Sequence, residues 1–221
     1  MKTPPVHIIY EDAEIVAIDK PAGLLSVHTR LEGRAMRESQ TTAENLLTWW
    51  VRKGQAKSSK RVWPVHRLDR ETSGVMMFAK SEKLADAIRD RWNELTSKEY
   101  CAIVAGEMES PSGKYVSYLA EDPRTFRVFS VENPADGKKA VTEWTEEAAR
   151  AGRSFVRIRL KSGRKHQIRV QFAEAGHPVV GDRRYGGAKA PRMFLHSSAL
   201  SFTHPATGKK FEWKSPCPFT L

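Results

Sequence analysis

The sequence predicts an α+β protein built on a mixed, mostly antiparallel sheet, and two observations support this class. Strand-like segments outnumber helical ones, and the helices do not alternate one for one with the strands. That order argues against a doubly wound parallel sheet, in which a helix follows each strand. At 221 residues the chain has the size of one domain, so we expect a single domain over residues 1–221.

Short segments of strand-like composition account for most of the predicted sheet. The clearest covers residues 155–160, where Val156, Ile158 and Leu160 alternate with two arginines. Such alternation is typical of a strand with one buried face. Further strands are predicted at residues 7–10, 14–18, 75–79, 99–105, 126–131, 140–145, 193–196, 200–203 and 210–213.

Three helices are predicted from capping residues and apolar spacing. Thr41 and Glu44 form a capping box at the start of the first helix. Ser81 caps a second helix, whose apolar positions extend to Leu95 at helical spacing. A third helix over residues 166–175 ends at Gly176, and residues 29–41 form a loop.

The charge balance favours a polyanionic partner. There are 37 Lys and Arg residues against 26 Asp and Glu, a net charge of +11. RNA, DNA and an anionic membrane surface all fit this surplus, and so does a basic surface that binds nothing. No segment has the roughly 20 apolar residues of a membrane span, and the N-terminus lacks a secretory signal. We therefore expect a cytoplasmic protein without a membrane partner.

Cysteine and histidine usage gives no sign of a metal or a disulfide framework. Cys101 and Cys217 stand far apart and lack C-x-x-C spacing, so free thiols are expected. The histidines match no ligand spacing familiar from metal sites: His166, His177, His196 and His204. No glycine-rich nucleotide motif is present either, and we expect no metal and no cofactor.

The densest chemical signal is the segment 65–74, Val-His-Arg-Leu-Asp-Arg-Glu-Thr-Ser-Gly. Here Asp69 stands between Arg67 and Arg70, next to His66. Neighbouring cations favour the ionised form of a carboxylate, which suits a nucleophile or a base. A surface loop with an incidental ion pair explains the same residues equally well.

Two further segments carry candidate binding groups. In residues 160–169 a glycine turn brings Arg164 and Lys165 to a helix start, with Arg169 one turn in. A solvated basic turn is the alternative there. Tyr100 opens a strand in the segment 98–106; tyrosines can stack on a splayed base, but in strands they more often pack in the core.

In this order the three segments resemble the RluA-type pseudouridine synthases. The stretches that carry the resemblance are His-Arg-Leu-Asp-Arg-x-Thr-Ser-Gly at 66–74, Lys-x-Tyr-x-Ala-x-Val-x-Gly at 98–106, Ser-Gly-Arg-Lys-His-Gln-Ile-Arg-Val at 162–170 and Gly-His-Pro at 176–178. Lys-Pro-x-Gly-Leu at 20–24, Gly-Asp at 181–182 and Leu-His at 195–196 also fit. The resemblance covers about residues 8–215.

The resemblance implies a fold and a set of roles. It implies a central sheet divided by an RNA-binding cleft, Asp69 as the essential aspartate, and Arg169 as the arginine that pairs with it. Tyr100 would pack on the target base and help to remove its C5 proton. Arg67 would fill the place that the target nucleotide leaves. Leu195 would contact the base, and we expect further substrate contacts from His66, Arg70, Arg164 and Lys165.

Two departures from the family pattern affect the expectations. The catalytic motifs begin too early for an N-terminal S4 domain, so the catalytic domain itself is expected to hold the RNA. Lys165 stands where the family often has Thr or Ser, and we expect it to touch the RNA backbone. The segments 24–27 and 30–32 look most like the S4-less RluA branch, which favours ribosomal RNA, transfer RNA or both.

The implied activity is isomerisation of uridine to pseudouridine, in which nothing is oxidised or hydrolysed overall. The sequence leaves open whether Asp69 attacks C1′ or removes a C2′ proton. A non-catalytic RNA-binding or chaperone module of the same fold is the rival hypothesis, and an RNA hydrolase is a second. The intact set of Asp69, Tyr100 and Arg169 favours the enzyme. A monomer is the default expectation.

Overall fold

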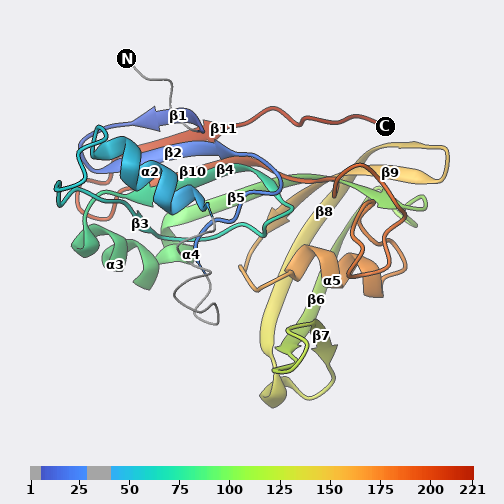
Figure 1. Cartoon of the computed structure of the whole chain (residues 1–221). Helices are drawn as coiled ribbons and strands as arrows, with labels where there is room; N and C mark the ends of the chain where they lie inside the picture. Colours follow the sequence, from blue (N-terminus) through green and yellow to red (C-terminus); the bar gives the residue numbers. More distant parts are fainter. Residues whose placement is uncertain (1–5, 29–40) are drawn as a thin grey trace. The chain divides into compact units, whose positions relative to one another are not determined.

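The computed structural model describes residues 6–28 and 41–221, and the chain forms two compact units. Unit 1 comprises the described residues up to Thr96 together with Ala199–Ser215, and unit 2 comprises Ser97–Ser198 with Pro216–Leu221. The elements of both are drawn in Figure 1. The segment 30–32 and nearly all of the predicted loop at 29–41 lie outside the described residues.

Unit 1 is an antiparallel sheet with helices packed on it. Its strands follow the order β1-β2-β4-β10, with β3 paired to β4 and β11 paired to β10. Their bounds are β1 (His7–Glu11), β2 (Ile15–Lys20), β3 (Trp63–Pro64), β4 (Ser73–Ala79), β10 (Leu195–Thr203) and β11 (Lys210–Lys214). Strand β10 contributes residues to both units, and it replaces the two strands that were expected at residues 193–196 and 200–203.

The central strands of unit 1 are buried on both faces. Every residue of β4 is buried, and Ile15, Val16, Ala17 and Ile18 of β2 are fully inaccessible. Figure 1 shows the helices α2 (Ala43–Val51) and α3 (Glu82–Asp90) flanking these strands. The continuous apolar run Val75–Ala79 is explained by this burial, because both faces of the strand are covered. A strand with one solvated face would need apolar residues only at alternate positions.

The helices of unit 1 differ from expectation at their ends. Thr42, not Thr41, is the N-cap of α2, and its hydroxyl accepts from the Asn45 amide at 3.1 Å. Ser81 caps α3 as predicted. The expected helix to Leu95 breaks at Arg91, after which α4 (Trp92–Leu95) forms one further turn. Leu84, Ile88 and Leu95 still lie in one apolar cluster, so the break preserves their common face.

Unit 2 is a second antiparallel arrangement, in the order β10-β5-β9-β8-β6-β7. The additional strands are β5 (Thr96–Ala105), β6 (Ser112–Glu121), β7 (Val128–Val131), β8 (Lys138–Arg150) and β9 (Arg153–Leu160), with a 3-10 turn η1 (Pro134–Asp136) before β8. In β9 the apolar residues Val156, Ile158 and Leu160 are buried while Arg157 and Arg159 are exposed, as the alternation predicts. Phe126 has φ +54, a left-handed turn conformation, so β7 starts only at Val128.

Strand β6 is the longest strand that the sequence did not predict. Its residues mix polar and aromatic side chains without clean alternation, and its start looks like a Ser-Pro-Ser-Gly turn. Gly113 pairs with Trp144 of β8, and a Cβ atom on Gly113 would lie 2.4 Å from the indole ring. Only glycine lets this Trp cover the strand, so the residue that suggested a turn is required for packing.

One helix packs on the sheet of unit 2. Helix α5 (Gln167–Glu174) begins after His166, which has φ +54, and ends before Gly176, which has φ +87. Val170 joins Leu119, Val128, Ala140 and Tyr185 in an apolar cluster. Eight strand pairs are antiparallel, namely β1–β2, β2–β4, β3–β4, β10–β11, β5–β9, β6–β7, β6–β8 and β8–β9, and an isolated bridge between Leu25 and Thr42 is parallel. The α+β class with a mostly antiparallel sheet is therefore confirmed.

In the described part of the chain, no helix is both long enough and apolar enough to cross a membrane.

Candidate active site

In unit 1, four of the predicted site residues lie in the loop between β3 and β4. Asp69 is half-buried, His66 is half-buried, and Arg67 and Arg70 are exposed. The loop closes with a turn in which the Thr72 amide donates to the Asp69 carbonyl at 3.1 Å. The loop therefore presents a carboxylate with cationic side chains in the adjacent exposed positions.

The segment after β2 holds this loop on both sides of Asp69. Lys20 is fully buried, and its Nζ donates to the carbonyls of Leu24 at 2.8 Å and Arg70 at 3.2 Å. The Ser26 hydroxyl donates to the Leu68 carbonyl at 2.7 Å and accepts from the Leu68 amide at 3.1 Å. The residues immediately before and after Asp69 are thus fixed by hydrogen bonds to their backbone.

Two further contacts tie the loop to the same segment. The Gly23 amide donates to the Arg70 carbonyl at 2.8 Å, and Arg70 Nε donates to the Gly23 carbonyl at 3.0 Å. We call residues 20–26 the strap. The strap holds the backbone of Leu68 and Arg70, the two neighbours of Asp69, and in this way positions the loop that carries it.

His66 is built into the wall behind the loop. Its Nε2 accepts from the Met77 amide of β4 at 3.0 Å, and its ring stacks on Trp92 with 4.6 Å between centroids. An accepting Nε2 carries no proton, so the ring donates only through Nδ1 when neutral. These contacts give His66 a structural role, alongside the substrate contact that we expected of it.

In unit 2, Tyr100 and Leu195 lie on neighbouring strands. Tyr100 is opposite Ile158 in the β5–β9 pair and is 8% exposed. Leu195 begins β10, the neighbour of β5, and is 3% exposed. Both side chains are predominantly buried, so each exposes little surface to a ligand. Tyr100 therefore packs in the core, and the catalytic role that the family resemblance implies for it is an additional one.

Arg169 has a carboxylate partner inside unit 2. Its Nε donates to Asp182 Oδ2 at 2.6 Å and its Nη2 to Oδ1 at 2.9 Å, a bidentate pair in which both side chains are buried. Asp182 also accepts from the Arg184 amide at 3.0 Å. A charge in the interior requires such a partner, so Asp182 is what allows Arg169 to be buried.

Tyr185 completes this cluster. The guanidinium of Arg169 lies 5.1 Å from the centre of its ring, and that of Arg127 lies 5.2 Å away. Its hydroxyl accepts from the Val128 amide at 3.1 Å and hydrogen-bonds His166 Nδ1 at 2.8 Å. Burial raises the pKa of Tyr185, so the phenol stays protonated. The aromatic ring and Asp182 together fix the plane of the Arg169 guanidinium.

The two basic residues before α5 differ in their surroundings. Lys165 pairs with Glu121, which neutralises it, and its Nζ lies 5.5 Å from the centre of the Phe126 ring. Arg164 Nε donates to the Lys139 carbonyl at 3.0 Å. Buried Lys98 lies close by: its Nζ would be 3.6 Å from a Cβ on Gly163, and burial together with the charge of Arg164 lowers its pKa to about 8.

Sequence reasoning missed the roles of Lys20, Asp182 and Tyr185. Lys20 and Asp182 stand in stretches that carry the family resemblance, but nothing local indicates which backbone or side chain they contact. The signal that was available is a lone lysine before Pro-x-Gly and a lone aspartate after a glycine. Charged residues in turn-rich segments read as solvated until the contacts are known.

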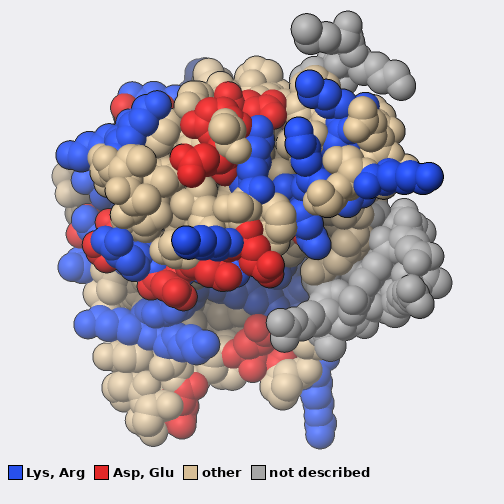
Figure 2. Space-filling view, turned by 90° about the vertical axis from the view of Figure 1, so that its left-hand side faces the viewer, with Lys and Arg blue, Asp and Glu red and all other residues tan. Residues whose placement is uncertain are grey.

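The described residues contain no group of three or more His, Cys, Asp or Glu side chains that could hold a metal ion. The expectation of no metal remains a prediction. The surplus of basic residues does not by itself locate an RNA-binding site. Figure 2 shows acidic side chains interspersed with basic ones on the face that it displays.

Comparison with known proteins decides the family. The family model described as RNA pseudouridylate synthase matches residues 14–174, well over half of the chain. This chain belongs to the RNA pseudouridine synthase family. The match includes Asp69, Tyr100 and Arg169, and the enzyme is accordingly an isomerase that acts on uridine in RNA.

Curated relatives agree with this assignment. The dual-specificity RNA pseudouridine synthase RluA of Vibrio parahaemolyticus is 34% identical over 98% of this chain and 85% of its own. Ribosomal large subunit pseudouridine synthase D of Pasteurella multocida is 33% identical over 97% of this chain and 68% of its own. A Bacillus subtilis relative described as an uncharacterized RNA pseudouridine synthase is also 33% identical, over 97% and 73%.

A solved structure shares the fold. The human RNA pseudouridylate synthase domain containing 4 superimposes with a TM-score of 0.76 at 21% identity, covering 96% of this chain and 88% of that one.

Proposed function

We propose that this synthase modifies specific uridines in ribosomal RNA, transfer RNA or both, with Asp69 as its catalytic carboxylate. The observation that carries the role of Asp69 is the strap, which fixes the backbone of Leu68 and Arg70 on either side of it. The choice of RNA is supported by relatives named for the large ribosomal subunit and for dual specificity. Structured RNAs also offer the unpaired nucleotides that such proteins read.

The reaction requires one working carboxylate and a bound, detached base. The N1–C1′ bond of uridine breaks, the uracil turns, and C5 joins C1′. A stacked target must first be extruded, which costs a few kcal/mol. In our proposal Arg67 occupies the place that the nucleotide leaves, and phosphate contacts offset the cost.

Tyr100 and Arg169 are proposed to act beside Asp69. Tyr100 packs on the uracil and assists removal of the C5 proton, and Leu195 contacts the base. Arg169 pairs with Asp69. The two hydrogen bonds that Arg169 donates to Asp182 support this role, because they hold its guanidinium in one orientation. His66, Arg70, Arg164 and Lys165 complete the proposed RNA contacts.

We further propose that both units act as one catalytic domain, since the family match includes residues of each. A cytoplasmic location is proposed on the basis of the two free thiols, Cys101 and Cys217, and a monomer is proposed as the default state. Light scattering of the purified synthase would test the oligomeric state directly.

The deciding experiment is a map of pseudouridines in a strain that lacks the gene. Carbodiimide labelling of its ribosomal and transfer RNAs should show that one or a few sites are lost. Wild type should restore them, and Asp69→Asn should not, although purified Asp69→Asn should still bind the same RNA. If no site changes and the purified protein is inactive on the deletion-strain RNA, the proposal fails. Loss of binding by the same factor as activity would remove the special role of Asp69.

A further inference from the structure

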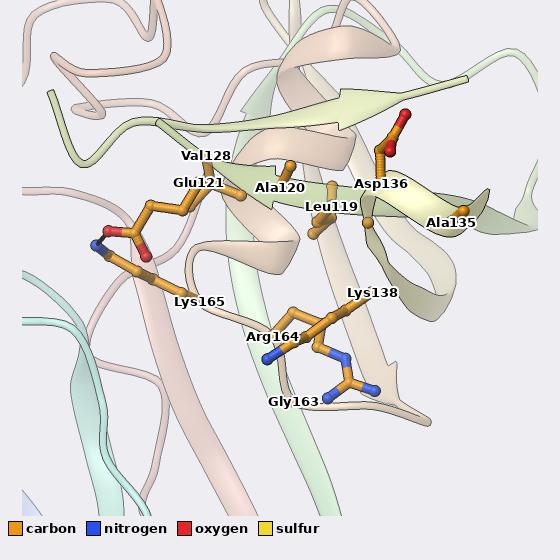
Figure 3. A pocket seen from close by; sticks show the side chains of 11 residues that line it. Leu119, Ala120, Glu121, Val128, Ala135, Asp136, Lys138, Gly163, Arg164 and Lys165 are labelled. Atoms are coloured by element: carbon orange, nitrogen blue, oxygen red, sulfur yellow. Dashed lines mark hydrogen bonds and ion pairs between the residues drawn. The ribbon is translucent and has the colours of Figure 1, made fainter. Parts of the chain in front are cut away.

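Unit 2 contains a pocket of about 580 Å³ whose lining includes Arg164 and Lys165 but not Asp69, Tyr100 or Arg169. It is bounded by β6, β7, the turn before β8 and the segment that precedes α5, as Figure 3 shows. Apolar and cationic side chains both line it: Leu119, Ala120, Val128, Lys138, Arg164 and Lys165. Its volume lies within the range of about 300–1,000 Å³ that is usual for small-molecule sites.

The positive charges of the pocket are unevenly compensated. At one end Lys165 is paired with Glu121. Elsewhere Lys138 and Arg164 lie together in Figure 3, while Asp136 points away from them. Among residues 6–28 and 41–221, no carboxylate comes within ion-pairing distance of Lys138 or Arg164. The pair therefore presents a local positive field.

A third cation lies next to this pair. Lys98 is 5% exposed, and the charge of Arg164 contributes to lowering its pKa to about 8. Lys98 of β5 therefore lies close enough to Arg164, in the segment before α5, for the two charges to interact. An anion placed on Arg164 would reduce the repulsion that it exerts on protonated Lys98.

We propose that this pocket holds one nucleotide of the RNA strand that flanks the target uridine. Its phosphate lies on Lys138 and Arg164, and its base rests on the apolar side of the pocket at half-buried Ala120, next to the buried side chains of Leu119 and Val128. The proposal rests on the proposed function, because it assigns the RNA a second point of attachment. An inorganic anion would gain nothing from contact with the apolar side of the pocket, and an apolar ligand would gain nothing from the cationic side chains.

The open rim favours part of a longer strand over a free nucleotide. Lys138, Arg164, Lys165 and Asp136 are all exposed, so a chain can enter and leave without threading through the protein. Single strands are typically held in this way, with cations along the backbone and a surface on which bases rest.

The test measures binding without catalysis, using a short fluorescein-labelled oligouridylate and fluorescence anisotropy. Lys138→Gln combined with Arg164→Gln should weaken binding by about tenfold and reduce the slope of log Kd against log salt by about 1. The matched control combines Lys114→Gln with Arg153→Gln, which removes the same charge from exposed residues of unit 2 outside the pocket. The control should change Kd by about twofold or less.

A charge-neutral variant separates volume from charge. Ala120→Leu fills part of the pocket, and it should weaken oligouridylate binding while leaving the salt slope unchanged. Poly-glutamate serves as a competitor for the alternative occupant, an acidic peptide, and it should displace the oligouridylate poorly.

Three outcomes would overturn the proposal. They are equal losses in the pocket and control pairs, unaltered binding by Ala120→Leu, and displacement by poly-glutamate as effective as by unlabelled oligouridylate. Pseudouridine formation by the wild type is assayed separately on deletion-strain RNA. Failure of that assay counts against the proposed function, whereas failure of the anisotropy test with an active wild type counts only against the pocket.

Discussion

Burial of charged side chains is the main feature of this synthase at the scale of single residues. Lys20, Lys98 and Arg169 are each at most 7% exposed. Lys20 donates to backbone carbonyls and Arg169 to Asp182, and burial together with the charge of Arg164 lowers the pKa of Lys98 from 10.5 to about 8. A buried cation that costs stability is expected where binding or catalysis uses the charge.

Lys98→Met should stabilise the protein near neutral pH. A pKa lowered from 10.5 to about 8 corresponds to about 3 kcal/mol against the protonated amine. Because the unfolded chain binds more protons at pH values between about 8 and 10.5, the stability of the wild type rises with pH through that window. Below about pH 8 the penalty is present in full. Urea unfolding at neutral and alkaline pH should therefore show a gain for Lys98→Met that shrinks toward pH 10.5.

Lys114→Met provides the comparison for this effect, since Lys114 is exposed on β6. It should leave the pH dependence of wild type unchanged. If Lys98→Met kept the wild-type rise in stability through the alkaline window, the buried amine would not be its source.

At the scale of elements, the strap connects the Asp69 loop to helix α2. The carbonyl of Leu25 accepts from the Ala43 amide at 2.8 Å, and that of Ser26 accepts from the Glu44 amide at 3.2 Å. The strap thus satisfies amides at the start of α2 with its carbonyls, and it fixes the catalytic loop with the side chains of Lys20 and Ser26. Damage to the strap should affect both.

Ser26→Ala removes two hydrogen bonds to Leu68 in a buried position. Leaving the partners unsatisfied costs about 1–3 kcal/mol of unfolding free energy. Because Leu68 precedes Asp69, we expect kcat to fall by about tenfold. The KM for RNA should change less than kcat does. Ser26→Thr retains the hydroxyl and should recover activity, and exposed Ser112→Ala should match wild type. An equal effect of Ser26→Ala on kcat and KM would argue against a positioning role.

The start of α2 can be located by a pair of neighbouring threonines. Thr42 is buried and its hydroxyl accepts from the Asn45 amide, whereas Thr41 is exposed. Thr42→Ala should lower the free energy of unfolding by about 1 kcal/mol, the usual cost of a lost N-cap. Thr41→Ala should cost less than about 0.5 kcal/mol. Thermal melts that ranked the two variants in the opposite order would restore Thr41 as the cap.

At the scale of the whole molecule, the net charge of +11 should make RNA binding sensitive to salt. Each phosphate that the protein neutralises releases counterions, so the logarithm of the affinity falls linearly with the logarithm of the salt concentration. For single strands each phosphate contact adds about 0.7 to the magnitude of this slope. We expect at least about a tenfold loss of affinity for deletion-strain RNA between about 50 and 200 mM salt. Filter binding over a salt series measures the slope.

Asp69→Asn provides a control for this measurement, because it removes no cation and should show the wild-type slope. An affinity that did not depend on salt would mean that base contacts dominate and that the basic surplus is a solvated surface.

Local patterns by themselves determined much of this protein. Alternation in 155–160 placed a strand with its correct buried face, and Ser81 and Gly176 marked helix ends. The ordered motifs around Asp69, Tyr100 and Arg169 indicated the family that the comparisons show. These features could be read because periodicity, capping and motif spacing depend on residues close together in the chain.

Tertiary structure decided what depends on residues distant in the sequence. It brought Lys20 within hydrogen-bonding distance of the Arg70 carbonyl, fifty positions away in the sequence. It also placed Trp144 over Gly113, in the segment 112–121 that forms strand β6. It also gave Arg169 its partner Asp182, and it brought Arg164 close to Lys98 and into one pocket with Lys138. A charged residue in a turn reads as solvated, because the free energy of burying it is repaid only by partners that the fold brings near.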